Sequence, residues 1–156
     1  MRLGVLITLL CGCLLATGVQ AIELTDLEGS PVSSMQQLEG KVVLVDFWAS
    51  WCAPCRKSFP WLNAIQQRHG AEGLVVVAVN EDTERSDAIQ FLQQVPADFS
   101  ILYDNAGALA EQYQLMGMPS SFLLDKKGQI RYRHVGFKQA DIADYEIKIR
   151  QLLAEE

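Results

Sequence analysis

The chain has 156 residues, which is enough for one domain of ordinary size and too few for two. Hydrophobic residues make up 49% of it and charged residues 21%, so general disorder and a fibrous protein are both excluded. The net charge of −6 makes nucleic acid an unsuitable partner, because phosphate binding requires a surplus of Lys and Arg.

The first 21 residues have the pattern of an export signal. Arg2 gives a positively charged start, residues 3–15 are almost entirely apolar, and Val19 and Ala21 place small residues at a cleavage site. We therefore expect residues 1–21 to be a signal peptide and residues 22–156 to be the folded domain. Two alternatives stay open, namely retention as an N-terminal membrane anchor and lipidation at Cys13. All three predict a periplasmic or otherwise extracytoplasmic protein.

The first half of the expected domain alternates between strand and helix signals. Residues 24–35 mix strand and turn residues. The β-branched run at 41–48 predicts a strand that is buried on both faces, and its one interruption is Asp46. A helix is expected to follow over about 52–68, and a second buried strand over 74–79.

The second half is predicted to contain three helices and three strands. In chain order these are a helix over 88–94, a strand over 99–103, a helix over 108–115, strands over 121–124 and 130–134, and a closing amphipathic helix over 141–153. In the first of these helices, Ile89 and Leu92 are expected to face inward, with Phe91 as a further candidate. This order predicts an α/β domain in which helices flank a mixed sheet.

The cysteines indicate redox chemistry. Cys11 and Cys13 lie in the expected signal, so the expected domain contains only Cys52 and Cys55. A disulfide-stapled scaffold needs more pairs than this. In the loop-entropy model, a four-residue loop stabilises by only roughly 1.9 kcal/mol, against about 3 kcal/mol for a 15-residue loop. A bond that stabilises so little is better suited to catalysis.

The position of the two cysteines predicts their division of labour. Cys52 is expected at the start of a helix, where unpaired amides and the helix dipole stabilise a thiolate, which is the nucleophilic form. Cys55 lies three residues later on the same helix face, within reach of a disulfide. We expect Cys52 to be the exposed attacking thiol and Cys55 the buried resolving thiol. Pro54 fits the first helical turn, where a missing N–H costs little.

Two segments resemble the thioredoxin family. Residues 45–55 (Val-Asp-Phe-Trp-Ala-Ser-Trp-Cys-Ala-Pro-Cys) are similar to its active-site strand and turn, and residues 117–128 to its cis-proline segment and hairpin. The export signal and the strand–helix unit at 74–94 resemble those of the TlpA/ResA branch, whose members are extracytoplasmic thiol–disulfide oxidoreductases. The resemblance implies a thioredoxin-like fold, with a mixed central β-sheet and the extra strand–helix unit of that branch.

The resemblance also implies the site residues. Cys52 would be the nucleophile, Cys55 the resolving thiol that pairs with it in a disulfide, and Pro119 a cis-proline packed against that disulfide. The implied substrate-binding residues are Trp51, Pro54 and Met118, of which Trp51 would shield the site and Met118 would offer backbone groups to the substrate chain.

Asp46 occupies the buried acid position of thioredoxins. Burial should raise the pKa of this carboxyl toward neutral, because an apolar strand disfavours its charged form. We therefore expect Asp46 to accept the proton of Cys55. The chain departs from ResA-type proteins shortly after the second cysteine, where Ser58 stands in the stretch that carries an acid in those proteins.

The resemblance implies a protein-disulfide reductase without a cofactor or metal. Its partners would be disulfide-containing exported proteins and a membrane electron donor of the DsbD/CcdA type, with a membrane tether as a further possibility. The dipeptide Ala53-Pro54 carries no His or charge to hold a thiolate, which favours a reductant over an oxidant. The alternative is a protein that binds a soft metal such as Cu(I) through the same two thiolates. A zinc site that adds His69 and His134 is disfavoured, because no second His follows His69 at a zinc-site spacing.

Overall fold

The structure, a computed structural model, describes residues 24–26, 29–32, 38–104 and 106–155. Its strands and α-helices, in chain order, are β1 (Leu24–Thr25), β2 (Pro31–Val32), β3 (Val42–Trp48), α1 (Ala53–His69), β4 (Leu74–Asn80), α2 (Arg85–Gln94), β5 (Ser100–Tyr103), α3 (Ala108–Gln112), β6 (Ser120–Leu124), β7 (Ile130–Val135) and α4 (Ile142–Ala154). The expected signal at 1–21 lies outside the described residues. Within the described part of the chain, no helix has the length and apolar character needed to cross a bilayer.

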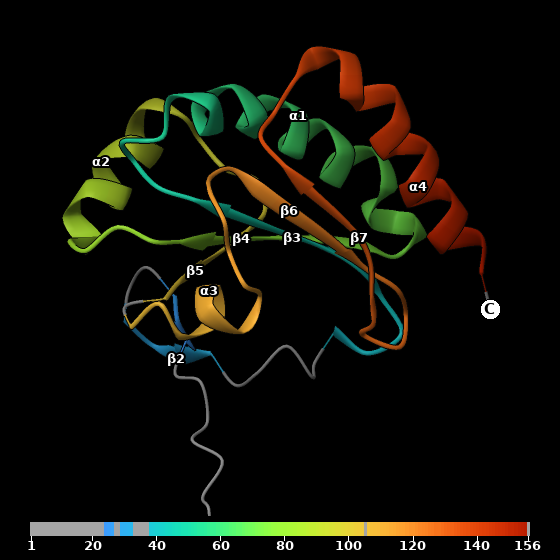
Figure 1. Cartoon of the computed structure of the whole chain (residues 1–156), viewed down its shortest axis with the longest axis horizontal. Helices are drawn as coiled ribbons and strands as arrows, with labels where there is room; N and C mark the ends of the chain where they lie inside the picture. The colour runs from blue at the N-terminus through green and yellow to red at the C-terminus, as the bar shows by residue number, and fades with distance from the viewer. Residues whose placement is uncertain (1–23, 27–28, 33–37, 105, 156) are drawn as a thin grey trace, which may run out of the picture.

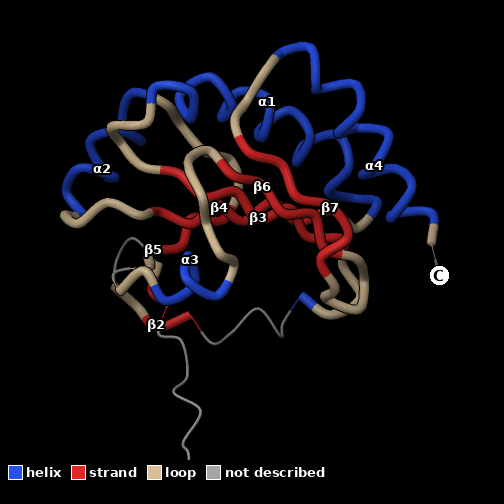
Figure 2. Tube along the Cα trace, viewed as in Figure 1, coloured by secondary structure: helices blue, strands red, loops and turns tan. Residues whose placement is uncertain are grey.

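The described strands form one mixed sheet in the order β2-β1-β5-β4-β3-β6-β7. Figure 2 draws the strands in red. Strand β3 lies inside it, parallel to β4 and antiparallel to β6. Helices α1, α2 and α4 lie along one face of the sheet, and α3 lies on the other (Figure 1). The mixed sheet, the flanking helices and the β4–α2 unit confirm the predicted architecture.

Burial of β3 on both faces explains its sequence. All seven of its residues are buried. Alternate residues contribute to two separate cores, because successive side chains of a strand point to opposite faces. Trp48 packs toward α1 and α2, where its ring meets those of Phe59 and Phe91 at centroid distances of 5.0 and 4.8 Å. Phe47 packs toward α3, against Tyr113 and Phe122.

Two details of the predicted helices are wrong. Ile89 is 42% exposed, whereas Ala88 and Phe91 are buried. Helix α2 begins at Arg85, three residues before the predicted start, and residues spaced three or four apart from Ala88 form its inward face, which leaves Ile89 outside. Helix α3 ends at Gln112 rather than at 115, because Gln114 adopts a left-handed conformation with φ of 53°.

Candidate active site

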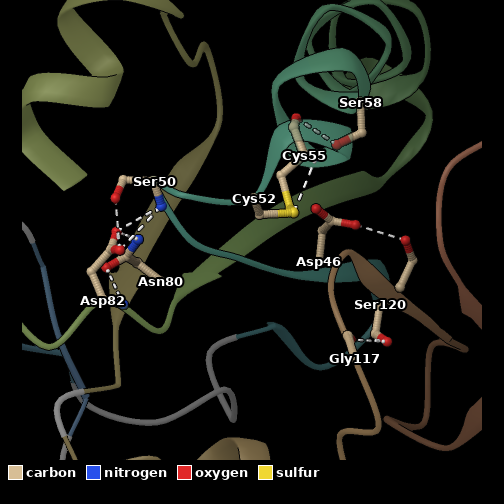
Figure 3. Close-up of a disulfide and its surroundings, with 10 residues drawn as sticks. Asp46, Ser50, Cys52, Cys55, Ser58, Asn80, Asp82, Gly117 and Ser120 are labelled. Carbon is tan, nitrogen blue, oxygen red and sulfur yellow. Dashed lines mark hydrogen bonds between the residues drawn. A yellow bond between two sulfur atoms is a disulfide. The ribbon is translucent and has the colours of Figure 1, made fainter. Parts of the chain in front are cut away.

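The two cysteines lie where β3 passes into α1. Cys52 is the N-cap of the helix, and a disulfide joins it to Cys55 with a Cα–Cα distance of 5.3 Å (Figure 3). The Cys55 N–H donates a hydrogen bond to Cys52 Sγ at 3.3 Å. The structure therefore brings together the pair that the sequence predicts.

The start of α1 is electropositive. The helix is 17 residues long, its first turn contains no acid, and Arg56 and Lys57 follow the disulfide directly. A helix N-terminus carries about half a positive charge and free N–H groups, and both stabilise an anion there. A thiolate at Cys52 would therefore be favoured once the disulfide is reduced.

Both cysteines are buried in the disulfide form. Cys55 is fully buried, as expected, but only 4% of Cys52 is exposed, so the prediction of an exposed Cys52 is wrong for this state. Cys52 belongs to the core cluster that also contains Trp48 and Phe59. Helix-start position alone does not reveal such packing.

Asp46 points from β3 toward the disulfide (Figure 3). It is 1% exposed, and the Ser121 hydroxyl donates a hydrogen bond to its Oδ1 at 2.7 Å. Its Oδ2 has no hydrogen-bond partner among the described residues. Burial raises the pKa of Asp46 to about 7, against the opposing effect of the Ser121 bond. The predicted rise in pKa toward neutral is confirmed, so the group can exchange a proton under physiological conditions.

A second acid, which sequence reasoning did not single out, fixes the loop before Cys52. Asp82 accepts hydrogen bonds from the Ser50 N–H at 2.9 and 3.1 Å and from the Ser50 hydroxyl at 2.8 Å. The Asn80 amide donates a further bond to Asp82 at 2.8 Å. Both Asn80 and Asp82 lie at the carboxyl end of β4, next to the end of β3 (Figure 3). Their position just after a predicted parallel strand could have indicated them, since functional sites of such sheets lie at the carboxyl ends of the strands.

The residues predicted to bind substrate lie around the disulfide loop and the start of β6. The Met118–Pro119 peptide bond is cis, as predicted, and Pro119 is buried. Met118 is half-buried and precedes the β6 ladder, which begins at Ser120. Trp51 is 70% exposed, so its indole is available at the surface beside Cys52. Pro54 is exposed in the first turn of α1.

Two further polar residues near the site were not predicted to act. Ser58 is buried and its hydroxyl donates a hydrogen bond to the Cys55 carbonyl at 3.0 Å, so the position that departs from the ResA pattern contacts the resolving cysteine. Glu81 follows β4, and its Oε1 is buried without a partner among the described residues. Burial and the nearby Asp104 raise the pKa of Glu81 to about 8.

The two histidines lie away from the cysteines. His69 is the last residue of α1 and lies 3.2 Å from Glu72 through Nδ1, whereas His134 belongs to β7. Among the described residues, no group of three or more His, Cys, Asp and Glu side chains is placed to hold a metal ion.

Comparisons with known proteins agree with this geometry. Residues 16–149 match the protein family described as Redoxin. The chain is 31% identical over 106 residues to the thiol-disulfide oxidoreductase ResA of Bacillus thuringiensis subsp. konkukian, with 68% of this chain and 61% of that protein covered. It is 36% identical over 132 residues to the thiol:disulfide interchange protein DsbE of Yersinia pestis, with 83% and 68% covered. The chain thus spans less than two thirds of the length of the ResA relative.

A solved structure has a similar fold over most of this chain. It is the crystal structure of a putative thiol:disulfide interchange protein DsbE from Chlorobium tepidum, with a TM-score of 0.77 and 46% sequence identity. The match covers 80% of this chain and 88% of that one. It confirms the thioredoxin-like fold predicted from the sequence.

Proposed function

Because this chain belongs to the Redoxin family, in its TlpA/ResA-like branch of thioredoxin-fold proteins, we propose that it is an extracytoplasmic thiol–disulfide oxidoreductase. Its substrates are disulfides of exported proteins, which it reduces through the Cys52-Ala53-Pro54-Cys55 dithiol. The observation that carries this proposal is the disulfide between a helix-capping Cys52 and a buried Cys55, placed above an acid whose pKa lies near 7.

The reaction begins from the dithiol form. The Cys52 thiolate attacks one sulfur of the client disulfide, so a Cys52–client bond forms and the other client sulfur leaves as a thiolate. Cys55 then gives its proton to the Asp46 carboxylate, and its thiolate attacks Cys52 Sγ. The Cys52–Cys55 bond forms, the second client thiolate leaves, and two electrons have passed to the client.

The surrounding residues have distinct roles in this proposal. Pro119 and Met118 offer an edge of backbone just before the β6 ladder, along which an extended client segment can lie beside the disulfide. Trp51 and Pro54, both within two residues of Cys52, present exposed apolar surface. Asp82 holds the Ser50 backbone, and so fixes the loop that carries Trp51 and Cys52.

The chemistry between the cysteines supports reduction rather than oxidation. Thioredoxin and the strong oxidant DsbA differ by about 150 mV, or roughly 7 kcal/mol. Their thiolate pKa values differ by about 3.5 units, or roughly 5 kcal/mol, so thiolate stabilisation accounts for most of the difference in potential. Ala53 and Pro54 add no charge or His to stabilise a thiolate. A reductant in an oxidising compartment must be recharged, for which a membrane electron donor of the DsbD/CcdA type is the proposed source.

Equilibration of the protein with glutathione buffers tests the direction. We expect a potential nearer to about −270 mV, that of thioredoxin, than to about −120 mV, that of DsbA. A value near that of DsbA would overturn the assignment as a reductant while leaving disulfide exchange in place.

Trapping of mixed disulfides tests the two thiols. Cys55→Ser should accumulate client proteins bound through Cys52, whereas the matched variant Cys52→Ser should accumulate none. Equal trapping by both variants would show that the roles are wrongly assigned. Tight Cu(I) binding together with failure to reduce a disulfide substrate such as insulin would favour the metal-binding alternative instead.

A further inference from the structure

A row of polar side chains crosses the face of the sheet that α1 and α4 cover. In the strand register, Asp46 of β3 lies opposite Ser121 of β6, and Ser121 lies opposite His134 of β7. Opposed residues of neighbouring strands point to the same face. The row therefore runs from beneath the disulfide to the outer strand of the sheet, on a face that is otherwise apolar around Asp46.

The inner part of the row is hydrogen-bonded and continues into a small cavity. The Ser121 hydroxyl donates to Asp46 Oδ1 at 2.7 Å, and its oxygen can still accept a hydrogen bond. A cavity of about 10 Å³ lies next to it, which is room for about one water molecule. The residues that line this cavity are Ser121, Leu123, Tyr132, Arg133, His134, Asp144, Tyr145 and Lys148.

The outer part of the row reaches solvent through His134. Its side chain is 31% exposed, and its Nε2 lies 3.3 Å from Asp141 Oδ2. The ring of Tyr145 packs against it at a centroid distance of 4.8 Å. The Tyr145 hydroxyl is buried and makes no hydrogen bond to the described residues, although it lies near enough to Ser121 and Asp46 for both to affect its pKa. A water in the cavity would satisfy this hydroxyl.

We propose that Ser121, one water in this cavity and His134 form a proton path that connects Asp46 with solvent on the side away from the disulfide. The inference rests on the proposed function, in which Asp46 must release the proton taken from Cys55 before the next turnover. Asp46 is only 1% exposed, and a client bound over Cys52 covers the disulfide side. A second route lets Asp46 lose its proton even while a client covers the disulfide side.

The transfer balances without a further reactant. Protonated Asp46 gives its proton to the Ser121 oxygen while the Ser121 hydroxyl proton passes to the water, and a water proton passes to a ring nitrogen of His134. Asp46 is then a carboxylate and His134 an imidazolium, which releases the proton to solvent. Imidazole suits this position because one ring nitrogen can accept a proton while the other donates one.

Charged groups of α4 and of the turn before it lie at the outer end. Asp141, which precedes α4, lies 3.3 Å from His134 Nε2, and Asp144 and Lys148 line the same cavity. The ammonium of Lys148 is paired with Asp144, and the Arg133 guanidinium packs over the Phe122 ring on the other face of the sheet. Burial raises the pKa of Tyr145, so its hydroxyl keeps its proton and serves to hold the water rather than to ionise.

Single-turnover kinetics with chemical rescue test the path. The reduced protein is held at pH 5, where Asp46 keeps its proton, and is brought to pH 7 in weakly buffered solution as it is mixed with a disulfide peptide. Asp46 must then lose its proton before it can accept that of Cys55, and release of the second peptide thiol is followed. His134→Gln should slow this step by about tenfold, less than the ~10²-fold or more expected on losing the base itself. Added imidazole should restore the rate, because a free base can then collect the proton at the surface. Alkylation of Cys52 should stay at the wild-type rate.

Two further variants decide whether the path or the local structure is responsible. Lys148→Gln changes a residue that borders the same cavity but is not a member of the path, so its rate should match that of the wild type. Ser121→Ala interrupts the path inside the protein, so it should be slow and imidazole should not rescue it. A His134→Gln rate equal to wild type, a lack of rescue, or equal slowing by Lys148→Gln would overturn the proposal. Absence of turnover in the wild-type protein would instead refute the proposed function.

Discussion

Two aspartates lie on either side of the disulfide loop, and their surroundings differ (Figure 3). Asp46 is 1% exposed and Asp82 is 4% exposed. The Asp82 carboxylate accepts hydrogen bonds from the Ser50 N–H, the Ser50 hydroxyl and the Asn80 amide. Asp46 accepts one bond, from Ser121, and its second oxygen has no partner among the described residues.

The contrast shows that two buried acids can be hydrogen-bonded very differently. Removal from water disfavours a carboxylate, and hydrogen-bond donors offset that cost where they are supplied. Around Asp82 the donors are supplied, and the carboxylate holds a loop together. Around Asp46 they are not, so the pKa rises to about 7 and the group can exchange a proton.

The largest effect expected from this contrast is on stability against pH. The pKa of Asp46 is about 7 in the folded protein, against an ordinary value of 3.8. Because the folded state keeps a proton that the unfolded state loses, stability falls as pH rises from about 4 to about 7. A rise of about 3 units corresponds to about 4 kcal/mol. Asp46→Asn has no carboxyl group to titrate, so its free energy of unfolding should not fall in this way. Relative to the wild type, the variant should therefore become more stable by about 4 kcal/mol between pH 4 and pH 8.

Urea unfolding of the oxidised proteins at both pH values measures this gain. Other titrating groups, including Glu81, are common to the two proteins and cancel in the difference. Asp82→Asn serves as the matched variant and should show no such gain at pH 8, because it loses acceptor capacity instead. Parallel stability curves for Asp46→Asn and wild type would mean that Asp46 stays charged in the folded protein.

The next largest effect is the loss of stability on removing Asp82. Asp82→Ala leaves the Ser50 N–H, the Ser50 hydroxyl and the Asn80 amide without their acceptor. Each buried donor left unpaired costs about 1–3 kcal/mol, and partial access to water reduces the sum, so a loss of about 3 kcal/mol is expected in urea unfolding at pH 7. Asp87→Ala, which removes an exposed acid of α2, should change stability by about 0.5 kcal/mol or less. A comparably small effect of Asp82→Ala would show that water replaces Asp82 as the acceptor.

The sequence predicted one of these acids and missed the other for a physical reason. Asp46 interrupts a Val-rich strand, so its burial could be inferred from the strand pattern alone. Asp82 lies in a polar stretch that also contains Glu81 and Glu84. Its partner Ser50 is 32 residues away, and nothing in the local sequence indicates which of these acids accepts hydrogen bonds from Ser50. Long-range pairing of this kind depends on the β3–β4 register.

Other predicted features also differ in whether they depend on local sequence or on tertiary packing. The strand β3, the cis peptide before Pro119 and the cysteine pair follow from local runs and spacings, and these predictions are confirmed. The exposure of Ile89 in α2 and the burial of Cys52 depend on where a helix starts and what packs over it, and the predictions for these two residues were wrong. Phe91 and Leu92 do face the core, as predicted. Ser121 could have been found by aligning the predicted strands, since it is a small polar residue opposite Asp46.

A smaller, kinetic effect tests the role of Asp46 as a proton acceptor separately from its effect on the free energy of unfolding. Asp46→Asn keeps the shape and the acceptor for Ser121 but cannot take the Cys55 proton. We expect resolution of the mixed disulfide at pH 7 to slow by ~10²-fold, or about 2.7 kcal/mol, with Cys52 alkylation nearly unchanged. Stopped-flow turnover of a disulfide peptide measures the first, and iodoacetamide labelling the second. Asp98→Asn removes an exposed acid and controls for the change in net charge. Wild-type turnover in Asp46→Asn would reduce Asp46 to a structural residue.

The smallest effect concerns Glu81. It precedes Asp82 in the chain but, like Asp46, has a buried carboxyl oxygen without a hydrogen-bond partner among the described residues. Burial and Asp104 raise its pKa to about 8, against an ordinary value of 4.5. Stability that depends on protonated Glu81 is therefore present at low pH and lost as pH rises toward 8 and beyond. The stability of Glu81→Gln relative to the wild type should therefore increase between pH 4 and pH 9.

This increase should be about 1 kcal/mol, because partial exposure lets water and salt weaken both causes of the raised pKa. The repulsion from Asp104 should weaken further between about 0.05 and 0.5 M salt, so the gain should shrink with salt while the part due to burial persists. An equal change in stability at pH 4 and pH 9 would mean that Glu81 reaches water in solution, and that among these acids only Asp46 carries an uncompensated burial cost.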